Sequence, residues 1–173
     1  MRVARPIETG GILEGKRSHD SRIVIIQQMT QQDANLAGNV HGGVVMKHID
    51  STAGIVAIRH ASGNVVTASI DRLDFFSPVF IGDLLNLKAS LNMVGRTSME
   101  VGVRVEAENF LTGQVRHTAS AYLTFVALSN DGRPVEVPPL ILETEEEKRR
   151  HQEAVARREM RLAEKVRERK SQR

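Results

Sequence analysis

The stretch from Val44 to His60 limits what this chain can fold into more than any other segment does. Apolar residues fall on nearly every side of a helix drawn over it, so such a helix must be covered all round. Gly42 and Gly43 stand at its start, where glycine lets the chain turn tightly and the first N–H groups have no partner within the helix. The sequence therefore predicts a core helix whose partly positive N-terminus faces a polar loop.

Asp50 lies inside this apolar segment, and its position needs an explanation. An acid in such surroundings costs several kcal/mol unless it is paired or used in chemistry. In one interpretation Asp50 is a satisfied buried acid and the two glycines form only a turn. In the other, an active site lies where the loop of residues 33–41 meets the helix. We adopt the second interpretation and keep the first as its alternative.

The rest of the chain is typical of strands separated by turns. A first β-branched run and four longer segments are expected to be strands: Arg22–Met29, Val65–Phe76, Leu84–Val94, Thr97–Asn109 and Val115–Leu128. In the last three, apolar and polar residues alternate, which indicates one buried face for each strand. We predict an α+β fold in which the four longer strands form an antiparallel meander that curls around the core helix.

We expect three parts along the chain: a flexible arm over residues 1–21, a single domain over 22–139 and a charged helical tail over 140–173. In the tail, Thr144 and Glu147 form a capping box, which predicts a helix that runs to about Lys170. Its apolar positions are sparse. The helix could therefore be solvated or packed on a neighbouring subunit.

Composition excludes several functional classes. Without cysteine there are no disulfides, thiolate metal sites or cysteine nucleophiles, and a reducing compartment is favoured. We expect a cytoplasmic protein that does not bind membranes, because no apolar run reaches the roughly 18 residues of a membrane span and the N-terminus lacks a signal sequence. The net charge of +3 lies from residue 143 onward and aromatic residues make up 3% of the chain, so nucleic acid binding is not expected.

Familiar catalytic and ligand motifs are also missing from the sequence. No G-x-S-x-G, G-x-G-x-x-G or phosphate-loop motif occurs, so serine-elbow, dinucleotide and phosphate-loop chemistry have no support. His41, His48 and His60 match no known metal-ligand spacing, and we expect no metal.

One combination of motifs resembles a known family. Gly38-Asn39-Val40-His41-Gly42-Gly43, followed by Met46-Lys47 and Asp50, is similar to the acyl-CoA thioesterases of the hotdog fold. The resemblance covers about residues 22–147 and continues through Val65-Val66-Thr67-Ala68-Ser69, Phe76-x-Pro78, Gly82-Asp83, Gly95-Arg96-Thr97-Ser98, Asp131-Gly132-Arg133-Pro134 and Val137-Pro138. It implies a sheet wrapped around one long helix and a homodimer with shared sites, assembled further into a hexamer as a trimer of dimers.

The resemblance also implies a reaction: fatty acyl-CoA is hydrolysed to fatty acid and CoA, with no cofactor beyond the CoA of the substrate. Asp50 would act as general base or nucleophile. Asn39 of the partner subunit would orient water or substrate, because the helix separates the two residues within one chain. The N–H of Gly43, with Gly42 beside it, would stabilise the oxyanion.

Further residues receive implied roles in binding, each with a structural alternative. His41 either contributes to the substrate site or only braces the loop. Backbone groups of Thr67, Ala68 and Ser69 would guide the pantetheine arm, or these residues form only a dimer-edge strand. Arg96, Thr97 and Ser98 would bind the CoA phosphates, or they form only a hairpin tip. The rival functions are a non-catalytic acyl-CoA sensor and a hotdog hydratase or dehydratase.

Overall fold

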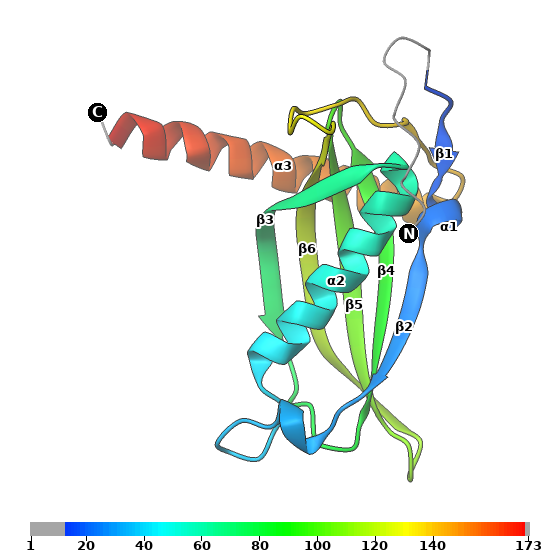
Figure 1. Ribbon diagram of the computed structural model, residues 1–173, viewed down its shortest axis with the longest axis vertical. Coiled ribbons are helices and arrows are strands. Elements are labelled where there is room, and N and C mark those ends of the chain that lie inside the picture. The colour runs from blue at the N-terminus through cyan, green and yellow to red at the C-terminus, as the bar shows by residue number, and fades with distance from the viewer. Residues whose placement is uncertain (1–12, 172–173) are drawn as a thin grey trace.

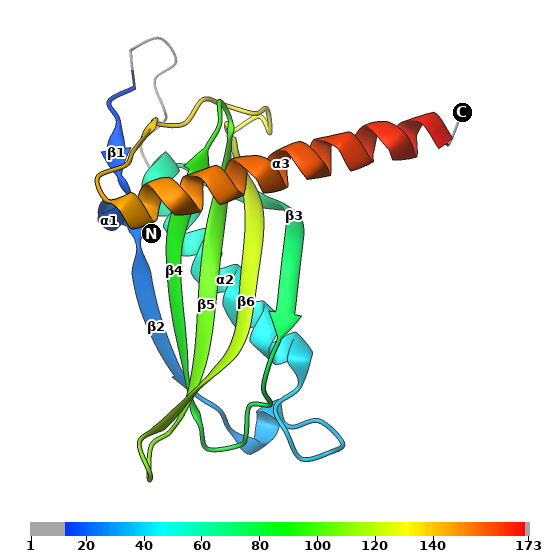
Figure 2. The ribbon, with the colours of Figure 1, turned by 180° about the vertical axis from the view of Figure 1, so that it is seen from behind.

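The computed structural model describes residues 13–171, and its centre is the long helix α2 (Gly42–Ala61). A five-stranded sheet curves around this helix, as Figure 1 shows. A second long helix, α3 (Glu145–Ser171), crosses the opposite face of the sheet (Figure 2). The predicted core helix and the predicted α+β class are both confirmed.

The sheet is antiparallel throughout and has the strand order β2-β4-β5-β6-β3. Its strands are β2 (Ile23–Gln28), β3 (Asn64–Phe75), β4 (Leu84–Val94), β5 (Ser98–Asn109) and β6 (Gln114–Leu128). Each strand begins and ends within one residue of its predicted bounds. Alternation in the sequence was therefore sufficient to locate β4, β5 and β6, whereas β2 was located as a β-branched run and β3 as a segment between turns.

The predicted pairing of the four longer strands as a meander was wrong at one point. Strands β4, β5 and β6 do form a meander, but β3 pairs with β6 at the far edge instead of with β4. Short hairpins join β4 to β5 and β5 to β6, so these strands pair with each other. The longer link over residues 76–83 carries the chain from β3, at one edge of the sheet, across to β4, which lies next to the opposite edge strand β2.

The predicted flexible arm is structured at its end. Residues 16–21 form β1 (Lys16–Arg17), which pairs in parallel with β7 (Leu140–Ile141), and the short helix α1 (Ser18–Ser21). The Nζ of Lys16 donates a hydrogen bond to the carbonyl oxygen of His60 at 2.8 Å, and Ser18 and Ser21 are buried. These contacts tie the segment to the C-terminal end of α2. Residues 1–12 lie outside the described residues. A 3-10 turn, η1 (Gln31–Asp33), follows β2.

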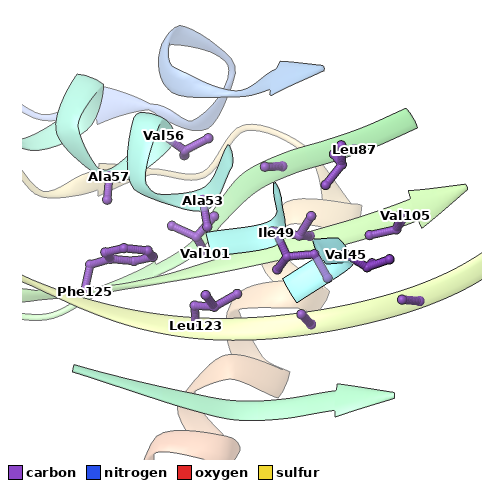
Figure 3. Close-up of a cluster of buried hydrophobic side chains, with 14 of the residues drawn as sticks. Val45, Ile49, Ala53, Val56, Ala57, Leu87, Val101, Val105, Leu123 and Phe125 are labelled. Carbon is purple, nitrogen blue, oxygen red and sulfur yellow. The ribbon is translucent and has the colours of Figure 1, made fainter. Parts of the chain in front are cut away.

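The core lies between α2 and the inner face of the sheet. Figure 3 shows Val45, Ile49, Ala53, Val56 and Ala57 of α2 packed against Leu87, Val101, Val105, Leu123 and Phe125. The small side chains at 53 and 57 let the helix approach the sheet closely. However, Ile55 and Ile58 of the same helix remain exposed, as does Ile70 of β3. The helix is therefore not covered on every side within one protomer.

The C-terminal helix packs on the outer face of its own sheet, which neither alternative for this helix anticipated. The capping box is confirmed, because the N–H of Glu147 donates to Thr144 Oγ1 at 3.2 Å and the N–H of Thr144 donates to Glu147 Oε2 at 3.1 Å. Polar contacts join α3 to the sheet, from Arg150 to Ser90 on β4, from Arg157 to Glu100 on β5 and from Arg161 to Asp71 on β3. The C-terminal part of the helix extends past the edge of the sheet (Figure 2).

Candidate active site

The start of α2 presents one free backbone donor. His41 is the N-cap residue, and its Nδ1 accepts a hydrogen bond from the N–H of Gly43 at 2.8 Å. The N–H of Val44 donates to the carbonyl oxygen of His41 at 2.9 Å. Within residues 13–171, the N–H of Gly42 has no hydrogen-bond partner. Of the two expected oxyanion donors, Gly42 is therefore available, whereas Gly43 is held by His41.

Asp50 and Thr67 form the main side-chain contact of the candidate site. The Thr67 hydroxyl, on β3, donates a hydrogen bond to Asp50 Oδ1 at 2.7 Å. Asp50 is only half-buried and its second carboxylate oxygen has no partner within the described chain, so this oxygen is open to a further hydrogen bond. We expected Thr67 to act through its backbone, but its side chain makes the contact.

The loop before α2 is organised by two asparagines. Asn35 Oδ1 accepts hydrogen bonds from the N–H groups of Ala37 at 2.8 Å and Asn39 at 3.2 Å. The N–H of Asn35 in turn donates to the carbonyl oxygen of Asn39 at 2.7 Å. The two residues therefore lie side by side at the base of a tight turn. The sequence interpretation singled out Asn39 and missed Asn35, although an Asx residue just before a turn is a recognisable signal.

Asp33 holds this loop against the helix start. Its carboxylate accepts hydrogen bonds from the N–H and hydroxyl of Thr30 at 2.7 and 2.8 Å, and its carbonyl oxygen accepts from the N–H of His41 at 2.7 Å. The Thr30 N–H lowers the pKa of Asp33, with smaller contributions from His48 and Lys47 in the same direction. The loop that carries the asparagines is therefore braced at both ends.

An aromatic side chain lies against the helix start. A Cβ atom placed on Gly42 would lie 3.7 Å from Cζ of Phe75, so this ring sits over the glycine turn. Phe76 and Phe80 are exposed nearby in sequence, and Phe80 forms a backbone bridge to Asn39. The ring of Phe75 provides an apolar surface next to the polar groups, which the sequence interpretation did not assign. The ring of Phe76 instead packs on His117, and the ring of Phe80 lies beneath the guanidinium of Arg116.

The remaining residues with implied roles are not gathered at this point. Ser69 faces away from Asp50 and donates its hydroxyl to Asp71 Oδ1 at 2.7 Å, and Ala68 is the residue that has no partner in the pairing of β3 with β6. Arg96 is exposed in the turn between β4 and β5 and pairs with Glu136 at 3.5 Å. The carbonyl oxygen of Arg96 accepts a hydrogen bond from the N–H of Val137. The neighbouring Pro138 contacts His60, so this turn lies toward the C-terminal end of α2. The phosphate-binding role of Arg96, Thr97 and Ser98 stays a prediction.

Within the same protomer, Asn39 and Asp50 are separated along the helix. About two helical turns lie between the helix start and Asp50, and Asp50 contacts Thr67 rather than the loop. Over residues 13–171, no group of histidine, aspartate or glutamate side chains is placed to hold a metal ion. None of the helices in that range is long and apolar enough to cross a membrane.

Comparisons with known proteins converge on one kind of enzyme. The model of the thioesterase superfamily matches residues 37–112. The chain is 41% identical to an uncharacterised acyl-CoA thioester hydrolase of Bacillus subtilis over 80% of each chain. It is 40% identical to the human cytosolic acyl coenzyme A thioester hydrolase over 79% of this chain, which spans only 37% of that longer relative.

Solved structures are similar over nearly the whole chain. An apo-hexameric acyl-CoA thioesterase has a TM-score of 0.85 and 41% identity, and the match covers 88% of this chain and 97% of that one. An acyl-CoA hydrolase of Staphylococcus aureus, in complex with butyryl coenzyme A and coenzyme A, has a TM-score of 0.83 and 35% identity over 90% and 95% of the two chains. Further structures of that enzyme carry alanine in place of an aspartate, an asparagine or a threonine.

Proposed function

Because the chain belongs to the thioesterase superfamily, as an acyl-CoA thioester hydrolase with the hotdog fold, we propose that it hydrolyses fatty acyl-CoA with Asp50 as the working carboxylate. The observation that carries this proposal is the 2.7 Å hydrogen bond from Thr67 to Asp50. This bond occupies one carboxylate oxygen and leaves the other for a water molecule. We further propose that no cofactor takes part and, by likeness to the human cytosolic relative, that the location is cytoplasmic.

The residues replaced in the Staphylococcus aureus enzyme support this assignment. Its asparagine, aspartate and threonine have the same spacing along the chain as Asn35, Asp50 and Thr67 here. The spacing favours Asn35 as the amide of the site, whereas the sequence motif favoured Asn39. Both asparagines are candidates for the amide of the site, since they share the hydrogen bonds of one turn. Substituting each one singly distinguishes their roles.

We propose that each site draws on two subunits. In a straight helix, Gly42 and Asp50 are roughly 12 Å apart, so one thioester carbon cannot meet both groups of one protomer. Two features of the protomer support a dimer: the outer edge of β3 is unpaired within the described chain, and Ile55, Ile58 and Ile70 are exposed beside it. Pairing of two β3 edges would bring Asp50 and Thr67 of one protomer toward the loop and the Gly42 N–H of the other. Three such dimers would make the expected hexamer.

In the proposed reaction, the thioester carbonyl oxygen accepts a hydrogen bond from the N–H of Gly42. Water attacks the carbonyl carbon as Asp50 accepts its proton; the C–S bond then breaks, and the sulfur of CoA takes the proton. Attack by Asp50 itself, followed by hydrolysis of the mixed anhydride, uses the same geometry. One backbone donor of this kind contributes about 3 to 4 kcal/mol to stabilisation of the transition state. His41 acts as a brace in this scheme, because its Nδ1 is occupied.

The test is thiol release from a panel of acyl-CoAs of increasing chain length. We compare the native chain with Asp50→Ala, Asn35→Ala, Asn39→Ala and Thr67→Ala, and use Asn130→Ala in an exposed turn as the matched control. Asp50→Ala should lower kcat by about a hundredfold or more, which is the usual contribution of a general base. Of the two loop variants, the one that removes the amide of the site should show the larger loss of kcat.

Each rival function predicts a different result. A hydratase would change the acyl chain without releasing thiol. A sensor would bind acyl-CoA without any turnover. Near-native thiol release by Asp50→Ala would reject the assignment of Asp50 while leaving the enzyme class intact.

A further inference from the structure

The side chain of Asp71 joins three elements on the outer face of the sheet. Its carboxylate is 8% exposed and accepts hydrogen bonds from Ser69 Oγ at 2.7 Å and Thr124 Oγ1 at 3.0 Å. The guanidinium of Arg161, on α3, pairs with the same carboxylate and donates to Thr124 Oγ1 at 2.7 Å. Strands β3 and β6 and helix α3 therefore meet at one buried charge.

This cluster lies where β3 departs from regular pairing. Thr67 lies opposite Phe125 and Ile70 lies opposite Leu123, so β3 has one more residue than β6 over this interval. Phe125 and Leu123 are buried in the core, which places both Thr67 and Ile70 on the inner face. The extra residue is Ala68, between Thr67 and Ser69. A second irregularity follows at Asp71, between Ile70 and Arg72.

The first irregularity decides which side chain faces Asp50. In a regular strand with Ile70 on the inner face, residue 68 would also point inward and residue 67 would point outward, because side chains alternate. The bulge reverses this parity. Thr67 therefore reaches Asp50 only while the extra residue is accommodated at position 68.

The hydrogen bonds of Asp71 hold this arrangement from the outer face. Ser69 follows the extra residue directly, and Thr124 is the residue paired with Ser69 on β6. By accepting from both hydroxyls, the carboxylate fixes the register of β3 against β6 on the far side of the bulge. Arg161 is what permits a carboxylate to be buried here, since a buried charge needs an opposite charge with good geometry.

We propose that Asp71 and Arg161 are positioning residues for hydrolysis: together they fix the bulged register of β3 that turns the Thr67 hydroxyl toward Asp50. The proposal rests on the proposed function of Asp50, and it gives α3 a role in the reaction although α3 lies on the opposite face of the sheet. Arg161 touches neither substrate nor Asp50 and acts only through β3.

The test compares two arginines that hold the same helix on different strands. Arg161→Ala loosens β3, whereas Arg150→Ala removes the contact of α3 with Ser90 on β4 and serves as the matched control. We expect Arg161→Ala to lower kcat by about tenfold or more with little change in KM, because small displacements of catalytic groups are costly. Arg150→Ala should stay close to the native kcat, and Arg161→Lys, which keeps the charge, should recover part of the loss.

A double substitution separates positioning from general loss of structure. If Arg161 acts through Thr67, adding Arg161→Ala to Thr67→Ala should cost little more than Thr67→Ala alone. The proposal would be overturned if the double variant lost kcat by the product of the two single losses. An unchanged kcat in Arg161→Ala would also overturn it.

Amide hydrogen exchange tests the same register without any activity. Residues 65–73 should exchange faster in Arg161→Ala than in Arg150→Ala, and equal rates would overturn the proposal. If the native chain released no thiol, the proposed function would fail while this measurement still decided whether Arg161 holds β3.

Discussion

The two long helices pack on opposite faces of one sheet by different kinds of contact. Helix α2 lies on the inner face through apolar side chains that are almost completely buried, such as Ile49, Ala53 and Val56. Helix α3 lies on the outer face, where Ala154 is its one fully buried residue within the described range and arginines make the principal contacts. Apolar packing therefore joins the inner helix to the sheet, whereas charged hydrogen bonds join the outer helix to it.

The difference teaches what each kind of contact can specify. Apolar contacts are non-directional, so they settle where a helix lies but select few individual partners. A guanidinium has donors in a fixed fork and selects a particular carboxylate. Arg157 binds both oxygens of Glu100, at 2.7 and 3.2 Å, and its guanidinium lies 3.7 Å from the centre of the Tyr122 ring. The outer helix therefore makes separate specific contacts with β5 and β3.

The largest effect on stability is expected from breaking the outer face at its most buried charge. Arg157→Ala leaves the carboxylate of Glu100, which is 1% exposed, with Asn92 as its one remaining side-chain donor among the described residues. We expect the free energy of unfolding to fall by about 3 to 5 kcal/mol, as when one partner of a buried pair is removed. Urea denaturation at fixed protein concentration measures this loss.

The control for that experiment replaces both partners with apolar residues. Glu100→Met combined with Arg157→Leu removes both charges at once, and buried pairs exchanged in this way are often neutral or stabilising. The double variant should therefore be clearly more stable than Arg157→Ala. Equal destabilisation of the two proteins would contradict the view that the unpaired charge, rather than lost packing, causes the effect.

A slightly smaller effect is expected from breaking the inner face. Leu123→Ala removes a fully buried side chain that packs against α2, as Figure 3 shows. The cavity and the lost burial should cost about 2 to 5 kcal/mol. The same denaturation assay reports this loss, and Leu123→Met, which nearly conserves volume, should cost less than about 1.5 kcal/mol. A Leu123→Ala protein as stable as the native chain would show that the inner face is loosely packed.

The smallest effect is a dependence on pH at the end of the inner helix. Burial lowers the pKa of His60, although the hydrogen bond to the carbonyl oxygen of Pro138, at 2.7 Å, acts in the opposite direction. Below the unfolded pKa of about 6.5, the unfolded chain binds a proton that the folded chain resists. Stability should therefore decrease as the pH falls below about 6.5, toward the lower folded pKa.

His60→Gln sharpens this prediction, because glutamine offers an N–H donor toward Pro138 but does not titrate. Thermal unfolding of both proteins between pH 7 and 5 should show a smaller loss for the variant. Parallel losses in the two proteins would assign the pH dependence to other groups.

Much of the fold could be predicted from local patterns. Strands β4, β5 and β6 were located to within one residue because alternation marks a buried face directly, and the capping box marked the start of α3. The pairing of β3 with β6 could not be predicted, since it depends on where the link over residues 76–83 crosses the molecule. Asn35 carried a local turn signal that the sequence interpretation overlooked, because its hydrogen bonds lie within four residues. The role of Arg161 depends on a contact with Asp71, far away in the chain, and no local pattern contains it.

The sequence by itself determined the helix start at Gly42-Gly43, the carboxylate at Asp50 and the family to which the chain is similar. Each of these depends on residue types at short spacing, and a short segment has the same periodicity and turn chemistry in any surroundings. Only the tertiary structure decided that Thr67 rather than Ala68 faces Asp50, because that choice depends on a bulge held from the other side of the sheet. A hydrogen bond across the sheet joins residues whose distance in sequence says nothing of their distance in space.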